Sequence, residues 1–269
     1  FDMLLSNAIK TLVNNNSNKK FFFGSYFILV IALFKVVRLK TISKYIYLFF
    51  KSFSNKWNKS LFLDLFLNDY HINCIKKFNP NFTTVFFNAG AHIQHHYLIY
   101  SKIVEKKFTL PNSDIDLNYD PIEEMYRFYD DILIDYSRLK NYQLLIATGL
   151  TQTPYDRLKF YYRPIDYKIF LKSFLIKSEQ IYPRMTRDFL IEFNSSSEAD
   201  KTEIIFDKIN KVNEKEIFEY DNRGTSIFVS FKYDLKIDND TFIYNVDRQK
   251  IYLKNLVSFV AIKNGMHDQ

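Results

Sequence analysis

A short run of β-branched and aromatic residues, Thr83–Asn88, constrains the fold of this chain more than any other stretch. It is followed by three small residues around Gly90, and three of the chain's five histidines then fall at positions 92, 95 and 96. A strand, a turn of small residues and a cluster of possible ligands are typical of α/β enzymes, which carry their chemistry at the carboxyl ends of parallel strands. We therefore expect an α/β fold whose functional site includes this loop.

A second strand is predicted at Gln143–Thr148, a continuous apolar run that ends at a glycine. Before it, Asp120-Pro121 and two glutamates have the composition of a helix start, with an N-cap side chain, a first-turn proline and acids against the helix dipole. That helix should extend to about Lys140. Because a β-α-β crossover makes its two strands parallel, Asn88 and Thr148 are expected at the same edge of one sheet.

The first eighty residues are expected to be mostly helical, and we interpret 1–80 as a cap or insertion region in front of an α/β core at 81–269. The most apolar run, 21–34, would span about 21 Å as a helix, which is less than a bilayer requires. The next run, 36–53, is a basic amphipathic helix that can rest on anionic lipid or expose a solvated face on a core helix. Peripheral membrane contact through 21–53 therefore stays open.

Strands and helices alternate through the rest of the chain, which favours a mostly parallel sheet flanked by helices. Two segments, Ile217–Tyr220 and Ile227–Tyr233, can pair as an antiparallel hairpin. The tail, Tyr252–Ile262, is predicted to be an apolar helix. The other predicted elements are strands at 159–163 and 189–193 and helices within 165–176 and at 197–212.

Composition excludes some classes of protein. The chain is 47% hydrophobic and 25% charged, the balance of a folded protein. A net charge of +7 suits an anionic substrate or a membrane surface. No basic block with interleaved aromatics indicates a nucleic-acid groove, so we expect no nucleic-acid partner. The single Cys74 permits a reducing compartment, and we expect a cytoplasmic protein, with membrane association as an open alternative.

The clustered histidines are candidate metal ligands. On a helix, His92, His95 and His96 share one face by the i, i+3, i+4 rule. Zinc takes imidazole and carboxylate ligands in tetrahedral geometry, and a catalytic zinc keeps one position open. The alternative is that these histidines simply hydrogen-bond in a cleft. His71 falls inside a predicted helix and is expected to be structural.

The segment Pro183–Asp188 is a second candidate site. Its two arginines, three residues apart before a strand, can hold a phosphate or carboxylate through paired hydrogen bonds. A structural ion pair with a neighbouring acid explains them equally well. Polar residues at the end of the second predicted strand can line a pocket, although an ordinary polar loop has the same composition. The predicted substrate-binding residues are Arg184, Arg187, Thr148 and Gln152.

The sequence Asn88-Ala-Gly-Ala-His92 resembles the Asp-x-x-Gly-His loop of the alkaline phosphatase superfamily, especially its nucleotide pyrophosphatase/phosphodiesterase branch. In that family the Asp and the His bind a zinc ion. The tail Asn264-Gly-Met-His267 is similar to the family's closing Asn-Gly-Thr-His, whose His ligates the same metal. The resemblance covers residues 83–267 and implies a phosphohydrolase fold. It implies a metal site at Asn88, His92 and His267. Independently of the resemblance, their helical spacing makes His95 and His96 further candidates.

The chain departs from the family pattern at several positions. Asn88 stands where the family has Asp, and Thr148-Gly149 replaces the Asp-His pair that binds a second zinc. The family's nucleophilic Thr or Ser would lie upstream of Phe1, so we expect an N-terminally truncated piece of a longer chain. The pattern therefore supports the fold more strongly than two-metal chemistry.

Three functional hypotheses follow. The first is a divergent metal-dependent hydrolase of phosphate esters or diesters, with zinc as the first candidate metal, acting on an anionic phosphate-containing small molecule or glycan. The second is a transferase of a phosphate-linked or similar group in surface-glycan biosynthesis. The third is a catalytically inactive binding relic, because Thr148-Gly149 replaces the second metal pair. Metal binding separates the first hypothesis from the third.

Overall fold

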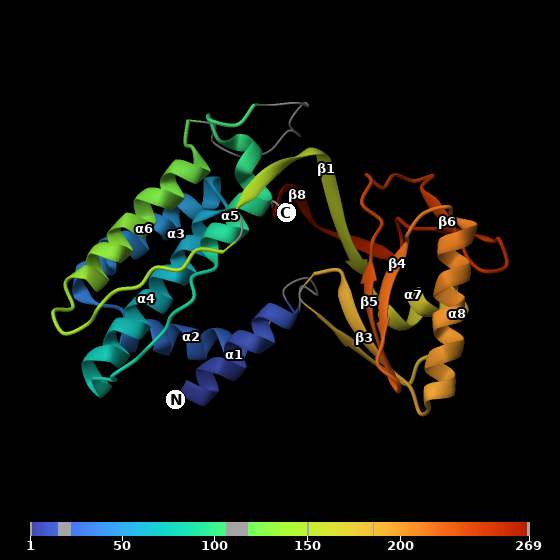
Figure 1. Cartoon of the computed structure of the whole chain (residues 1–269), viewed down its shortest axis with the longest axis horizontal. Coiled ribbons are helices and arrows are strands. Elements are labelled where there is room, and N and C mark those ends of the chain that lie inside the picture. The colour runs from blue at the N-terminus through green and yellow to red at the C-terminus, as the bar shows by residue number, and fades with distance from the viewer. Residues whose placement is uncertain (1, 16–22, 106–117, 150, 185, 268–269) are drawn as a thin grey trace. The chain divides into compact units, whose positions relative to one another are not determined.

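The computed structural model describes residues 2–15, 23–105, 118–149, 151–184 and 186–267 (Figure 1). The chain forms two compact units. One comprises residues 1–25 and 159–262, and we call it the sheet unit. The other comprises residues 26–158 and 263–269, and we call it the helical unit.

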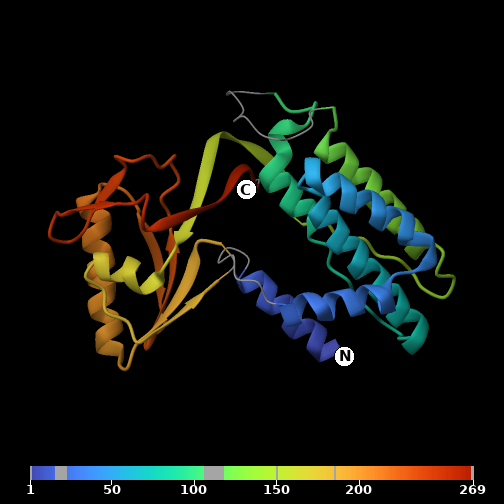
Figure 2. The ribbon, with the colours of Figure 1, turned by 180° about the vertical axis from the view of Figure 1, so that it is seen from behind.

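The helical unit consists of helices packed around one apolar core. Helices α3 and α6 lie along α4, and α5 packs on both α4 and α6 (Figures 1 and 2). Trp57, Leu61 and Ile93 are among the core side chains that are almost entirely buried. The helices are α2 (Phe23–Val36), α3 (Ile42–Ser54), α4 (Asn58–Phe78), α5 (Ala89–Tyr97) and α6 (Pro121–Ser137), with 3-10 turns η2 (Leu39–Thr41) and η3 (Leu98–Tyr100).

Local sequence signals explain two of the helix ends in this unit. The Asp120 side chain accepts hydrogen bonds from the backbone N–H groups of Ile122 and Glu123, and Pro121 occupies the first turn of α6. At the carboxyl end of α4, Asn79 adopts a left-handed conformation with φ of 43°, and the helix ends there, just before Pro80. The prediction of a helix start at Asp120 is therefore confirmed.

The sheet unit contains a four-stranded antiparallel sheet in the order β2-β3-β5-β4. Helix α8 packs against β4 and β5 (Figure 1). The strands and helices are α1 (Asp2–Asn15), β2 (Gln180–Pro183), β3 (Asp188–Glu192), β4 (Phe218–Asn222), β5 (Ser226–Phe231), α7 (Tyr167–Ser173) and α8 (Ser196–Val212). A hairpin pairs β6 (Phe242–Tyr244) with β7 (Lys250–Tyr252), and β1 (Gln152–Pro164) pairs with β8 (Val257–His267).

Burial alternates strictly along the central strands, although apolar residues occupy both faces. In β3, Phe189 and Ile191 are completely buried, and in β5 so are Ile227, Val229 and Phe231. Period-two burial is what a sheet with one covered face requires. The predicted hairpin of β4 and β5 is confirmed, with Phe218 opposite Phe231 and Asn222 opposite Ile227.

The prediction of a mostly parallel sheet is wrong. The sheets among the described residues are antiparallel, and no parallel sheet is formed there. Residues 83–88 and 142–149 form no strand, and Phe86 and Leu145 are 77% and 88% exposed. These segments have the side chains of strands, but a strand requires a hydrogen-bonded neighbour, and none pairs with them in the described residues.

The predicted helix at 252–262 is also wrong, because this part of the chain contains β7 and β8 instead. Its β-branched residues, such as Val257 and Val260, suit a strand as well as a buried helix. Pairing with β1 decides in favour of the strand.

None of the helices in the described ranges is both long and apolar enough to cross a bilayer.

Candidate functional site

The amino-terminal end of α5 is held by a buried carboxylate from α4. Asp64 accepts hydrogen bonds from the backbone N–H groups of Asn88 (3.3 Å) and Ala89 (2.9 Å). These are N–H groups that the helix itself leaves without partners. Burial raises the pKa of Asp64, which outweighs the opposing effect of its hydrogen bonds. The acidic side chain that caps α5 therefore comes from a distant residue and not from the preceding loop.

A tyrosine hydroxyl explains the small residues that follow. Tyr129 of α6 donates a hydrogen bond to Asp64 (2.8 Å) and accepts one from the backbone N–H of Gly90 (2.7 Å). A Cβ atom on Gly90 would lie 3.1 Å from Cε2 of Tyr129. The glycine thus permits close packing of α5 on α6, and the pattern Asn88-Ala-Gly-Ala-His92 has a structural explanation that requires no ligand.

The carboxyl-terminal half of α5 is held by the end of β8. The Asn264 side chain donates to the carbonyl of His96 (2.6 Å) and accepts from the backbone N–H of Ile99 (3.3 Å). Asn264 is almost fully buried. Two of the sequence motifs, the histidine cluster and the Asn264-Gly265 tail, therefore lie in contact within the helical unit.

His95 faces protein partners with both ring nitrogens. Its Nδ1 lies 2.9 Å from the carbonyl oxygen of Gly265, and its Nε2 lies 3.4 Å from Nε2 of Gln152. With the proton on Nδ1, His95 donates to Gly265 and accepts from Gln152. Through these contacts His95 holds the Asn264-Gly265 tail against α5, and Gln152 lies beside the histidine cluster.

His92 and His96 form a pair one helical turn apart. Their ring centroids are 4.6 Å apart, with an interplanar angle of 51°. His92 is exposed, and His96 is half-buried. Desolvation by the groups packed around the imidazole lowers the pKa of His92, and the nearby His95 and Lys263 lower it further. The pair therefore presents two imidazoles side by side on an anchored helix.

Other predicted metal ligands are placed less favourably. Asn88 is exposed and makes no side-chain cap bond to α5, although its backbone N–H binds Asp64. His267 is the last residue of β8, and its side chain lies outside the described part of the structure. Among the described residues, no group of three or more His, Cys, Asp or Glu side chains is positioned to hold a metal ion.

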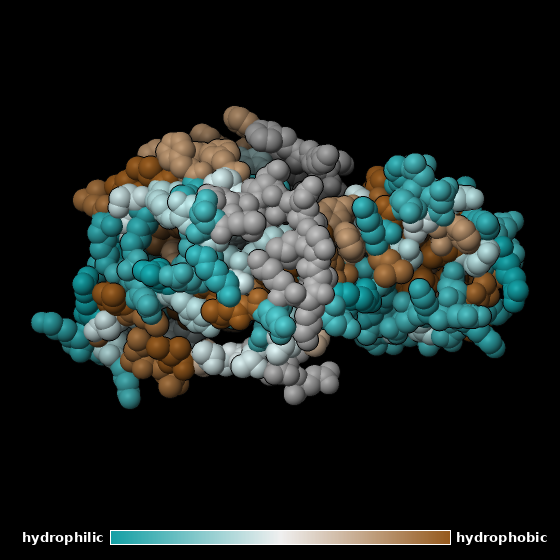
Figure 3. Space-filling view, turned by 90° about the horizontal axis from the view of Figure 1, so that it is seen from above, coloured by the Kyte–Doolittle hydropathy of each residue, from teal (hydrophilic) through white to brown (hydrophobic). Residues whose placement is uncertain are grey.

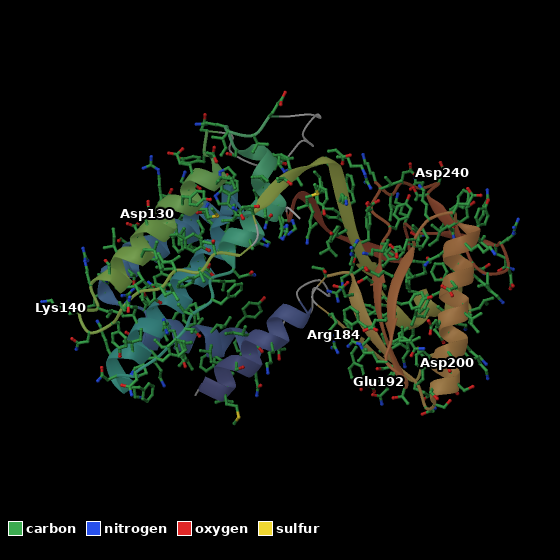
Figure 4. All side chains as sticks on the ribbon, in the orientation of Figure 1. Asp130, Lys140, Arg184, Glu192, Asp200 and Asp240 are labelled. Carbon is green, nitrogen blue, oxygen red and sulfur yellow. The ribbon has the colours of Figure 1, made fainter. Side chains whose placement is uncertain are left out.

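The predicted substrate-binding residues fall in both units. Arg184 and Arg187 belong to the sheet unit, whereas the histidines belong to the helical unit. Arg184 is exposed after β2 (Figure 4), and the Arg187 guanidinium lies 4.3 Å from the ring centroid of Tyr161. Thr148 is exposed in a segment without regular structure. Of this predicted set, Gln152 contacts a histidine of α5, namely His95.

Three residues that shape this site were not predicted from the sequence. Asp64 and Tyr129 hold α5 in place, and Lys263 contributes positive charge next to His92. Asp64 lies 24 positions before Asn88 in the middle of a helix, so no local spacing indicates its role. Lys263 directly precedes the Asn264-Gly265 motif in the sequence. This position was the available indication that Lys263 could lie near the histidines.

The arrangement offers two neighbouring imidazoles on α5 and the nearby ammonium group of Lys263 on β8. Imidazoles are ligands for a metal ion, and an ammonium group attracts an anion. Comparison with known proteins adds no functional information, since no protein-family model, no curated protein and no solved structure matches the chain. The resemblance to the alkaline phosphatase superfamily therefore remains a prediction.

Proposed function

We propose that the chain binds a divalent metal ion, with zinc as the first candidate, through His92 and His96. We further propose that it uses this ion to hydrolyse a phosphate ester or diester. The observation that carries the proposal is the 4.6 Å separation of the two imidazole rings on adjacent turns of α5. Histidines at i and i+4 lie on one helix face, where both can ligate the same ion.

The surroundings of the pair support metal binding in two ways. Asp64 and Asn264 fix the two ends of α5, so little further ordering is needed when a metal binds. Two protein ligands also leave coordination positions for water and for a substrate oxygen, as metal-assisted hydrolysis requires. Lys263 adds positive charge beside His92, which suits an anionic phosphate group.

The first experiment measures metal content and turnover in the same samples. The purified chain is loaded with zinc or manganese, and bound metal is determined by elemental analysis after removal of excess ion. Hydrolysis of bis(4-nitrophenyl) phosphate is then followed. We expect the His92→Ala/His96→Ala variant to lose both the metal and the hydrolysis, because each histidine contributes one ligand.

The matched control is His71→Gln. Both ring nitrogens of His71 are engaged elsewhere, with the hydroxyls of Tyr136 (2.8 Å) and Thr83 (2.7 Å). Circular dichroism must show that both variants are folded. If the control retains metal and the double variant loses it, the ion is bound by the α5 pair. Equal metal content in the wild type and the double variant contradicts the proposal.

A second function, metal binding without turnover, has one observation in its favour. No third His, Cys, Asp or Glu joins the pair within the described residues, whereas catalytic zinc commonly has three protein ligands. Stoichiometric metal in the wild type without any hydrolysis above the double variant would support this second function. It would also overturn the hydrolase assignment.

A further inference from the structure

Helix α3 carries apolar side chains on two separate faces. One face packs into the core of the helical unit through Tyr45 and Leu48. The other face points away from the core, and its residues follow the helical spacing i, i+4, i+7, i+8 and i+11. We call this second face the outer stripe, and its members, between 41% and 72% exposed, are Ile42, Ile46, Phe49, Phe50 and Phe53.

The outer stripe is a continuous apolar surface. The Phe49 ring contacts the rings of Phe50 and Phe53, with centroids 5.5 and 5.3 Å apart. Leu39, in the turn before α3, is 89% exposed. Apolar side chains also gather on the helical unit in the space-filling view (Figure 3). Single exposed apolar residues are common on proteins, but a contiguous patch of this kind marks an interaction surface.

The charge of the surrounding sequence is one-sided. Residues 26–63, which belong to the helical unit, contain seven Lys or Arg and no Asp or Glu, whereas the whole chain has 37 basic and 30 acidic residues. Part of this positive charge is paired with acids: Lys44 binds Asp131 of α6 (2.7 Å), and Arg38 and Lys40 bind Asp135 of α6. Beyond the carboxyl end of α3, Lys56 and Lys59 are exposed. The outer stripe therefore lies within a cationic part of the chain.

We propose that the outer stripe docks on an anionic lipid surface, with α3 lying in the plane of the membrane. An exposed apolar helix face in a basic segment is the arrangement by which interfacial helices bind anionic lipid. Charge favours this partner over a second copy of the chain, because a second copy would bring its own lysines to the same contact. With 13 residues, α3 is too short to span a bilayer.

The test is co-sedimentation of the full chain with vesicles. One set contains phosphatidylcholine with about 30% phosphatidylserine, and the other contains phosphatidylcholine alone. We expect binding to the anionic vesicles, weakened when the salt concentration is raised about fivefold. Phe50→Ser/Phe53→Ser should weaken binding by about tenfold or more, because it removes two apolar groups from the lipid contact.

The matched control is Phe82→Ser, since Phe82 belongs to the same unit, is 83% exposed and lies outside α3. It should bind vesicles as the wild type does, and circular dichroism should show both variants folded. The proposal is overturned if the wild type does not bind anionic vesicles, or if the double variant binds them as well as the wild type does. It is also overturned if the wild type instead self-associates through the outer stripe. No added metal is needed, so the result is independent of the proposed function.

Discussion

Gly265 lies so close to the backbone of Gln94 that a Cβ atom at position 265 would stand 2.3 Å from the Gln94 carbonyl oxygen. The neighbour is a backbone atom of a helix, so no side-chain rotation can relieve the clash. In the same place, the Gly265 carbonyl lies 2.9 Å from Nδ1 of His95. Contact between the tail and α5 therefore requires a residue without a side chain at position 265.

Gly265→Ala should destabilise the helical unit by about 1–3 kcal/mol, because the tail must move away from α5. Trp57, the chain's single tryptophan, is fully buried in this unit, so its fluorescence during urea unfolding reports the loss. Gly149→Ala is the control, since a Cβ there would meet nothing within 4 Å. Equal unfolding midpoints for the two variants would show that the close approach at Gly265 has no energetic consequence.

Asp64→Ala should lower the free energy of unfolding of the helical unit by about 1–3 kcal/mol. The substitution removes the acceptor for two backbone N–H groups of α5 and leaves the Tyr129 hydroxyl without its carboxylate. Asp130→Ala is the control, because Asp130 is exposed on α6 (Figure 4). Trp57 fluorescence in urea measures both, and an Asp64→Ala midpoint no lower than that of the control would contradict the capping role.

Asp120 should make the stability of the helical unit depend on pH in the acidic range. Burial alone would raise its pKa, but hydrogen bonds from the Ser101 hydroxyl and from backbone N–H groups, including that of Lys102, outweigh burial and lower it. A carboxyl with a lowered folded-state pKa stabilises the fold above its unfolded-state pKa. This stabilisation is lost as the pH falls through the folded-state value.

The corresponding variant is Asp120→Asn, which cannot ionise. We expect it to be less stable than the wild type at neutral pH and to lose less stability between about pH 6 and about pH 3. Urea midpoints at several pH values, read from Trp57 fluorescence, measure the difference. Parallel curves for the two proteins would show that Asp120 is not the source of the pH dependence.

Local signals in the sequence were sufficient for many elements of the fold. The cap at Asp120 and the hairpin of β4 and β5 depend on neighbouring residues, and both are confirmed. The strands expected at 83–88 and 143–148 depended on partners elsewhere in the chain. Apolar β-branched residues indicate that a segment can form a strand, but they do not supply the neighbouring strand.

The candidate site shows the same division between local and distant information. The helical spacing of His92 and His96 was readable from the sequence, and the structure places their rings 4.6 Å apart. The role of His95 was not readable, because its partners Gly265 and Gln152 lie 170 and 57 positions away. Only the folded chain shows that one of the three histidines is occupied with holding the tail.

Arg38 is the centre of a partly buried ion network between α4 and α6. Its guanidinium binds Asp69 (2.7 Å from Nε) and Asp135 (2.6 Å from Nη2), and Asp135 also binds Lys40. The Asp69 side chain is completely buried and also accepts from the Thr41 hydroxyl (2.5 Å). Removing the arginine would therefore leave a buried carboxylate without its main cationic partner.

Arg38→Met should destabilise the helical unit by about 3–5 kcal/mol, because it leaves the buried Asp69 carboxylate without a compensating positive charge. Arg127→Met is the matched control. Arg127 also pairs with an acid, Glu123 (2.7 Å), but both of these side chains are largely exposed, so the loss should stay below about 1 kcal/mol. Urea unfolding followed by Trp57 fluorescence gives both values.

A second substitution, Asp69→Asn, should restore part of the stability lost in Arg38→Met, since it removes the uncompensated charge. Failure of this rescue would assign the loss to packing of the arginine side chain and not to its charge.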